Sequence, residues 1–167
     1  MKGYTTITGD LAVMNSGLSD LKGLESLTGV GGRLFIQNNA MLTSFAGLDN
    51  LATLGDLTLI GNAGLISVDG LEVLKTAKAV TIINNQALIN LNGLGNVTQI
   101  DALDINMNNA LTSLSMDALE RVEGDFSISY NTSLCTSLAE ALQTQVMDRD
   151  GIGGTVTISG NNECTTP

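Results

Sequence analysis

Cys135 and Cys164 are the only thiols in the chain, and they carry its most definite chemistry. They lie 29 residues apart and bracket the C-terminal segment. A lone pair of cysteines placed this way predicts a disulfide, which would indicate a secreted or cell-surface protein. The alternative is two buried free thiols, which behave as small apolar side chains.

Catalytic and metal-binding chemistry has few residues to draw on. The chain has no histidine, which removes Ser-His and Cys-His nucleophiles as well as histidine metal ligands. Asp101 and Asp104 could form an acidic pair, but solvated charges on a strand are far commoner than paired catalytic acids. The stretch 148–151 (DRDG) resembles part of a calcium loop, yet Val146 stands where a ligand would be needed, which favours a helix-ending turn. We expect no enzymatic activity, no cofactor and no metal.

The charge balance narrows the range of partners. The net charge is −10 and only seven residues are Lys or Arg, so a phosphate-binding surface for nucleic acid is not expected. No apolar run reaches the roughly 20 residues that span a bilayer. The opening stretch MKGYTTITGD turns polar at once, so this chain shows no signal peptide.

A repeat of 23 residues organises the chain. Pairs of apolar residues at strand spacing recur with this period: Leu11/Val13, Leu34/Ile36, Leu57/Leu59, Val80/Ile82, Leu103/Ile105 and Phe126/Ile128. An Asn follows each pair at a fixed distance from the second coil onward, at Asn39, Asn62, Asn85, Asn108 and Asn131, with Asn161 after the last strand. We interpret this column as an inward ladder that satisfies buried backbone groups at the turns.

A fixed period in this range is typical of a solenoid, in which each repeat is one coil stacked on the last. We therefore predict a single domain over 1–167: a mainly β, right-handed β-helix-like stack of coils over about 9–134, with a cap over about 135–167. In the cap, Leu138, Ala141, Leu142 and Val146 recur at helical spacing, and Thr136 or Ser137 could be the N-cap. Coil four lacks a glycine and is one residue shorter, which predicts a local helical turn at 115–119.

The recurring pattern "L-x-GL-x-x-L" followed by "L-x-I-x-x-N", as in 21–24 and 34–39, resembles the receptor L domain of the leucine-rich-repeat superfamily. The resemblance covers about residues 9–134. It implies a leucine-rich solenoid used for recognition at a cell surface, in a free-standing variant without cysteine-rich modules. It transfers no ligand-contacting residue to this chain.

The positions that vary from coil to coil are the candidates for function. On the outward side of the strands, Phe35, Thr58, Ile60, Thr81 and Ile83 are predicted to form a contiguous semi-apolar patch. Two alternatives stay open: another segment covers these residues, or they are present only because β-branched residues suit strands.

The leading hypothesis is a non-enzymatic extracellular recognition or adhesion module that binds a protein partner or surface ligand through this patch. The second is ice binding by a flat face of Thr, Ser, Ile and Asn. The third is a structural spacer within a larger surface protein.

Overall fold

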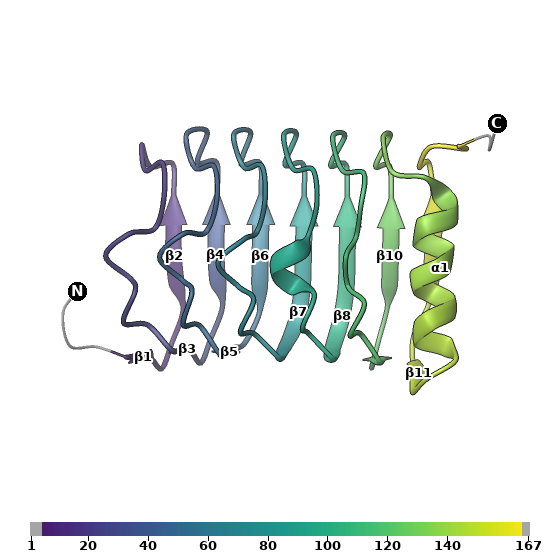
Figure 1. Ribbon diagram of the computed structural model, residues 1–167, viewed down its shortest axis with the longest axis horizontal. Helices are drawn as coiled ribbons and strands as arrows, with labels where there is room; N and C mark the ends of the chain where they lie inside the picture. Colours follow the sequence, from purple (N-terminus) through teal and green to yellow (C-terminus); the bar gives the residue numbers. More distant parts are fainter. Residues whose placement is uncertain (1–4, 165–167) are drawn as a thin grey trace.

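Seven parallel strands form one long side of the molecule (Figure 1), and the first six follow the 23-residue repeat, whereas the last pairs with residues 30 positions before it. The structure, a computed structural model, describes residues 5–164. In spatial order the strands are β2 (Leu11–Met14), β4 (Leu34–Gln37), β6 (Leu57–Ile60), β7 (Thr76–Ile83), β8 (Gln99–Asn106), β10 (Phe126–Ser129) and β12 (Val156–Ser159). Equivalent positions of successive coils face each other across each pair, as in Leu34↔Leu57 and Leu57↔Val80.

Shorter strands and two helical segments complete the coils. β1 (Thr6–Ile7), β3 (Gly29–Val30) and β5 (Thr53–Leu54) pair in a narrow second sheet. β9 (Arg121–Val122) pairs with the first residues of β8, and β11 (Gly151–Ile152) pairs with β9. The 3₁₀-helix η1 spans Asn92–Leu94, and the α-helix α1 spans Thr136–Met147. The chain is thus a parallel β-solenoid with one α-helix near its C-terminus, which confirms the predicted fold class.

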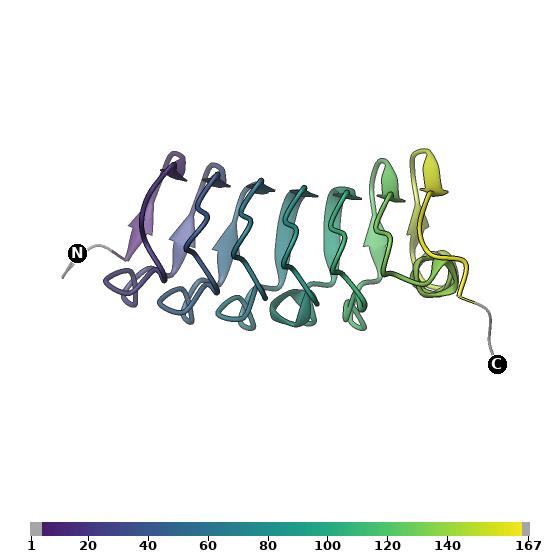
Figure 2. The ribbon, with the colours of Figure 1, turned by 90° about the horizontal axis from the view of Figure 1, so that it is seen from above.

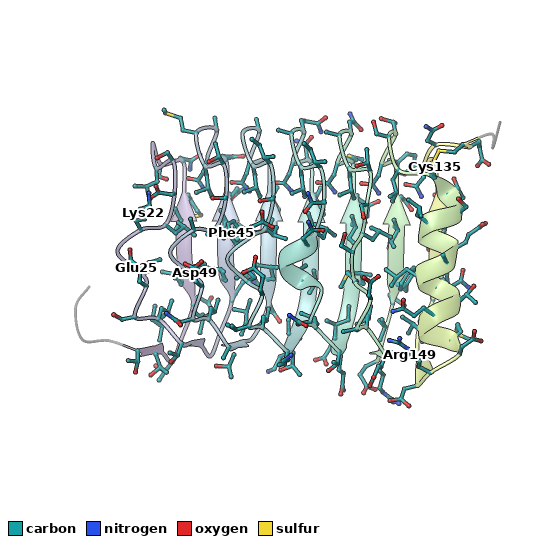
Figure 3. The ribbon with its side chains drawn as sticks, in the orientation of Figure 1. Lys22, Glu25, Phe45, Asp49, Cys135 and Arg149 are labelled. Atoms are coloured by element: carbon teal, nitrogen blue, oxygen red, sulfur yellow. A yellow bond between two sulfur atoms is a disulfide. The ribbon has the colours of Figure 1, made fainter. Side chains whose placement is uncertain are left out.

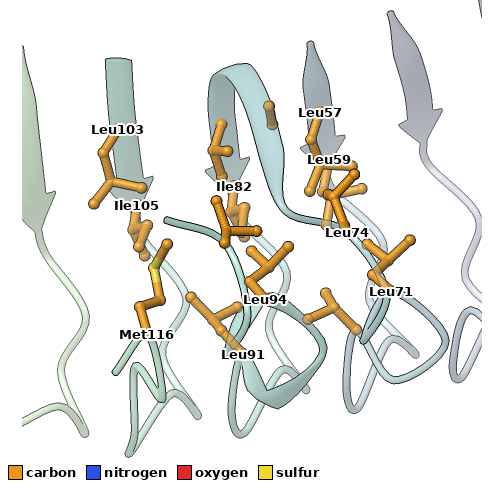
Figure 4. Close-up of a cluster of buried hydrophobic side chains, with 14 of the residues drawn as sticks. Leu57, Leu59, Leu71, Leu74, Ile82, Leu91, Leu94, Leu103, Ile105 and Met116 are labelled. Carbon is orange, nitrogen blue, oxygen red and sulfur yellow. The ribbon is translucent and has the colours of Figure 1, made fainter. Parts of the chain in front are cut away.

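The core is a continuous column of leucine, isoleucine and valine between the strands and the irregular segments. Figure 4 shows strand residues such as Leu57 and Ile82 facing Leu71, Leu74 and Leu91 from the opposite side of the coils. All five of these side chains are fully buried. Each coil is too narrow to enclose a core alone, so this burial exists only because the coils stack.

The asparagine column forms the predicted ladder. The backbone N–H of Asn62 donates to Oδ1 of Asn85 over 3.0 Å, and that of Asn85 donates to Oδ1 of Asn108 over 3.0 Å. The Asn85 amide donates in turn to the Leu59 carbonyl oxygen over 3.2 Å. Ser16 begins the ladder, because its N–H and hydroxyl both donate to Oδ1 of Asn39. The ladder therefore satisfies backbone groups that the stacked turns remove from water.

The helical turn lies in a different coil from the one predicted at 115–119. In the coil of Gly70, a Cβ would collide with the Phe45 carbonyl oxygen, φ is +111°, and the glycine N–H donates to the Glu72 carboxylate. In the next coil Gly93 is the equivalent of Gly70 but has no positive φ, and Gly95 stands where Glu72 would be, so no carboxylate is available there. A 3₁₀ turn forms at this place, in which the Gly95 N–H donates to the Asn92 carbonyl oxygen. In the coil that is one residue shorter, Met116 is buried at the position that leucine occupies in the other coils.

The disulfide predicted between Cys135 and Cys164 is present, with a Cα–Cα distance of 5.2 Å. Figure 3 shows Cys135 at one end of α1 and Arg149 at the other. The Arg149 guanidinium donates to the carbonyl oxygens of Asp117 and Leu119. The C-terminal helix is thus held covalently at one end and by hydrogen bonds at the other.

Two details of the helix prediction were wrong. The helix begins at Thr136, so Cys135 is the N-cap, and it makes no side-chain capping bond. The buried face is Ala139, Leu142 and Val146, while Leu138 is 43% exposed. Leu142 and Val146 are thus buried as predicted, whereas Leu138 and Ala141 are exposed and Ala139 completes the buried face.

The N-terminal end of the stack lacks a comparable cover among residues 5–164. A shallow hollow there is lined by Leu11, Val13, Leu18, Leu21 and Leu24. Leu11 and Val13, whose equivalents in the next coil are fully buried, are partly exposed. Among residues 5–164, no element therefore covers this end of the core.

Candidate functional site

The candidate site is the outward side of the seven long strands, termed here the strand face. Figure 2 shows these strands along one long side of the stack and the irregular segments along the other, with no described segment lying over the strands. Two columns of outward side chains run across the face in strict register. The first column is Ala12, Phe35, Thr58, Thr81, Asp104, Ser127 and Thr157, and the second is Met14, Gln37, Ile60, Ile83, Asn106, Ser129 and Ser159, of which Ser129 is buried.

The five residues predicted to form a patch are neighbours on this face. Phe35 pairs with Thr58, Thr58 with Thr81, and Ile60 with Ile83 across adjacent strands. Each of the five is partly exposed, so the alternative that another described segment covers them does not hold. Side-by-side β-branched residues shield one another, which leaves a low, uncovered apolar surface. Its role in binding remains a prediction.

The other half of the face is polar, and its central residue is Asp104. This carboxylate is partly buried and accepts a hydrogen bond from the Asn106 amide. Burial raises the pKa of Asp104 above its usual value, although hydrogen bonds from Asn106 and Ser127 oppose this effect. Three ion pairs occur within residues 5–164, and none includes Asp104. Asp104 is thus a half-buried anion with polar neighbours but no counter-charge in the part of the chain that the structure describes.

The other residues with possible chemistry have structural surroundings. Asp101 is exposed and makes no bond to Asp104, so the two do not act as an acidic pair in this structure. The stretch 148–151 ends α1, since the Asp148 N–H donates to the Thr144 carbonyl oxygen and β11 begins at Gly151. No cluster of three or more potential metal-ligating side chains was found within residues 5–164.

One surface column escaped the sequence analysis. Thr43, Ile66, Ile89 and Thr112 are linked by backbone hydrogen bonds just after the asparagine turns. Ile66 is 47% exposed and Ile89 45% exposed. The 23-residue spacing of these two isoleucines is the sequence signal of this column, which lies outside the strands.

A second column was also missed: the residue just before each ladder asparagine has a left-handed backbone. Asn38 and Asn84, with φ of +54° and +59°, suit this conformation, and the Asn-Asn pairs at 38–39 and 84–85 are its sequence signal. Met107 and Tyr130 occupy the same position with φ of +58° and +57°. Both side chains are about half exposed, at 50% and 55%. Met107 and Tyr130 therefore place bulky side chains at one edge of the strand face, at the position where other coils have Asn38 and Asn84.

Fold and face together define a parallel β-solenoid with an open, two-column strand face. No family model, curated protein or solved structure matches the chain. No helix within residues 5–164 is long and apolar enough to cross a membrane. The features of the strand face itself therefore provide the basis for a functional assignment.

Proposed function

We propose that this protein is a non-enzymatic, extracellular recognition or adhesion module that binds a protein partner through the strand face. The observation that carries the proposal is the uncovered patch of Phe35, Thr58, Ile60, Thr81 and Ile83, held in register on a rigid sheet. Exposed apolar surface on a regular scaffold is typical of contact sites. The stacked coils fix the backbone, so a partner would meet a preorganised surface at little ordering cost.

Two further features support an extracellular recognition role. The Cys135–Cys164 disulfide is of the kind that persists in oxidising compartments. The leucine and asparagine columns resemble the receptor L domain, a recognition module. In this chain those columns are buried, which leaves the variable outward residues to select the partner.

The test uses two isoleucines of the same coil as a matched pair. Ile60 lies in the patch, whereas Ile66 is exposed in the column outside the strand face. Wild-type protein, Ile60→Asp and Ile66→Asp are immobilised and exposed to cell-surface and secreted proteins from the source organism. We expect a captured protein to be retained by wild type and Ile66→Asp and lost by Ile60→Asp. Equal retention by both variants would show that another surface binds.

Ice binding is the second candidate, and the in-register pairing favours it. Thr58 pairs with Thr81 and Ile60 with Ile83, which makes a small regular array with a strand spacing of roughly 4.8 Å. Phe35 and Asp104 interrupt the array on either side. Thermal hysteresis at sub-millimolar protein concentration would support this function, and melting and freezing points that coincide would refute it.

A further inference from the structure

We propose that the strand face recognises a protein segment that places a cationic side chain on Asp104 and apolar side chains on the patch. This inference rests on the proposed function and specifies the chemistry of the partner. Asp104 is the only charged residue in the two outward columns, and it lies on β8, next to the strand that carries Thr81 and Ile83.

Asp104 is a half-buried carboxylate without an ion-pair partner among residues 5–164. Its hydrogen bonds from Asn106 and Ser127 orient the carboxylate but leave its charge uncompensated within residues 5–164. Within residues 5–164 the partly buried acidic residues are Asp20, Asp56 and Asp104, and of these Asp20 pairs with Lys22 and Asp56 with Arg33, whereas Asp104 has no ion pair. A Lys or Arg side chain from a partner would supply the missing charge at a position that is already partly desolvated.

The distribution of residues on the face argues against a second copy of this chain as the occupant. A two-fold axis along the central strand β7 would place β6 opposite β8, and would thereby set Thr58 against Asp104 and Ile60 against Asn106. That arrangement buries the Asp104 carboxylate against a neutral side chain without a counter-charge and the apolar Ile60 against an amide, which is unfavourable. A partner with its own apolar and cationic parts avoids this conflict.

The distances between residues on the strand face also determine how far apart the partner's apolar and cationic side chains must be. Phe35 and Asp104 occupy the same column on β4 and β8, three strand intervals apart, or roughly 14 Å at about 4.8 Å per interval. An extended chain that rises about 3.4 Å per residue covers this distance in about four residues. The expected motif is therefore apolar residues at positions i and i+2 and a Lys or Arg at i+4, read in either direction.

A phage-displayed library of random 12-residue peptides provides a defined probe. Peptides are selected on the full chain, synthesised, and titrated against wild type, Asp104→Asn, Asp101→Asn and Ile60→Asp by isothermal calorimetry. Asp104→Asn and Asp101→Asn change the net charge equally and lie on the same strand, so nonspecific attraction of basic peptides changes equally in both. Asparagine retains a carbonyl oxygen that can accept the hydrogen bond from Asn106, and thermal melts confirm that each variant is folded.

We expect the selected peptides to carry the motif and to lose at least about tenfold in affinity for Asp104→Asn, with less than about twofold loss for Asp101→Asn. Equal effects of the two aspartate variants, with binding still abolished by Ile60→Asp, would overturn the cation inference and leave the proposed function standing. Peptides that bind all variants equally, or a selection that yields no binder, would overturn both.

Discussion

Replacing Asn85 by alanine removes the central link of the asparagine ladder. The Asn85 side chain is fully buried and accepts hydrogen bonds from both the backbone N–H and the side-chain amide of Asn62, each at 3.0 Å. It also donates to the carbonyl oxygens of Leu59 and Ile83, at 3.2 Å each, and to Oδ1 of Asn108. The substitution therefore strands groups in two neighbouring coils.

The size of the destabilisation follows from the buried groups that lose a hydrogen-bond partner. The Asn62 N–H is left buried without an acceptor, which costs about 1–3 kcal/mol, and the other broken bonds add about 1 kcal/mol. We expect a loss of about 3 kcal/mol in the free energy of unfolding. For a chain of this size, each 1 kcal/mol lowers the melting temperature by roughly 2–4 °C. The melting temperature of Asn85→Ala should therefore fall by roughly 6–12 °C.

The control is Asn109→Ala, which removes an exposed asparagine from the adjacent coil. Surface substitutions of this kind change stability by about 0.5 kcal/mol or less. Both variants are melted side by side and followed by circular dichroism, and urea titration gives the free energies. If Asn85→Ala melts within about 1 °C of Asn109→Ala, the ladder does not stabilise the stack in the way argued from its hydrogen bonds.

Two further predictions concern the cap and the strand face. Replacing Cys135 and Cys164 by alanine together should lower stability by about 3–4 kcal/mol, the chain-entropy value for a 29-residue loop, and unchanged urea midpoints would contradict this. The pH dependence of the stability of Asp104→Asn tests the raised pKa of Asp104. The folded state binds the Asp104 proton more tightly than the unfolded state does. Ionisation of the carboxylate therefore destabilises the fold as pH rises above 3.8. Asp104→Asn should therefore melt above wild type at pH 7, with the difference vanishing below pH 3.8, whereas a variant that melts below wild type at pH 7 would refute the reasoning.

The periodic features of the fold could be predicted because every coil meets the same physical demand. Leu57 and Ile82 face the core, and Asn62 and Asn85 cross-link the turns, for reasons that repeat in each coil. The Cys135–Cys164 bond followed from cysteine count and position alone.

Features that depend on a single coil were harder to predict. The 3₁₀ turn forms at Asn92–Leu94 because Gly95 stands where the preceding coil has Glu72, whose carboxylate accepts a hydrogen bond from the Gly70 N–H. Met116 spans the shortened coil because its unbranched side chain adapts to an irregular space. The structural effect of such a substitution can be predicted only by comparing the residue with those at the same position in the neighbouring coils.

The placement of the apolar residues on the strand face could be predicted, whereas the surroundings of Asp104 could not, and the binding role of the patch stays a prediction. The registered columns placed Ile60 beside Ile83 from sequence spacing alone. The isolation of Asp104 was not predictable, because it depends on which basic side chains lie within reach in three dimensions. The exposed Ile66 and Ile89 lie outside the strands, where strand alternation does not predict which side chains face outward.

The difference between the two ends of the stack gives its unfolding a direction. At the C-terminal end, the disulfide and the contacts of Arg149 fasten the last coils together, whereas Leu11 and Val13 close the N-terminal end only in part. Because each coil touches only its neighbours, the first coil can detach while the rest of the stack stays intact. Slowly exchanging amides should therefore concentrate toward the disulfide, and the N-terminal coils should be the first to become accessible to a protease.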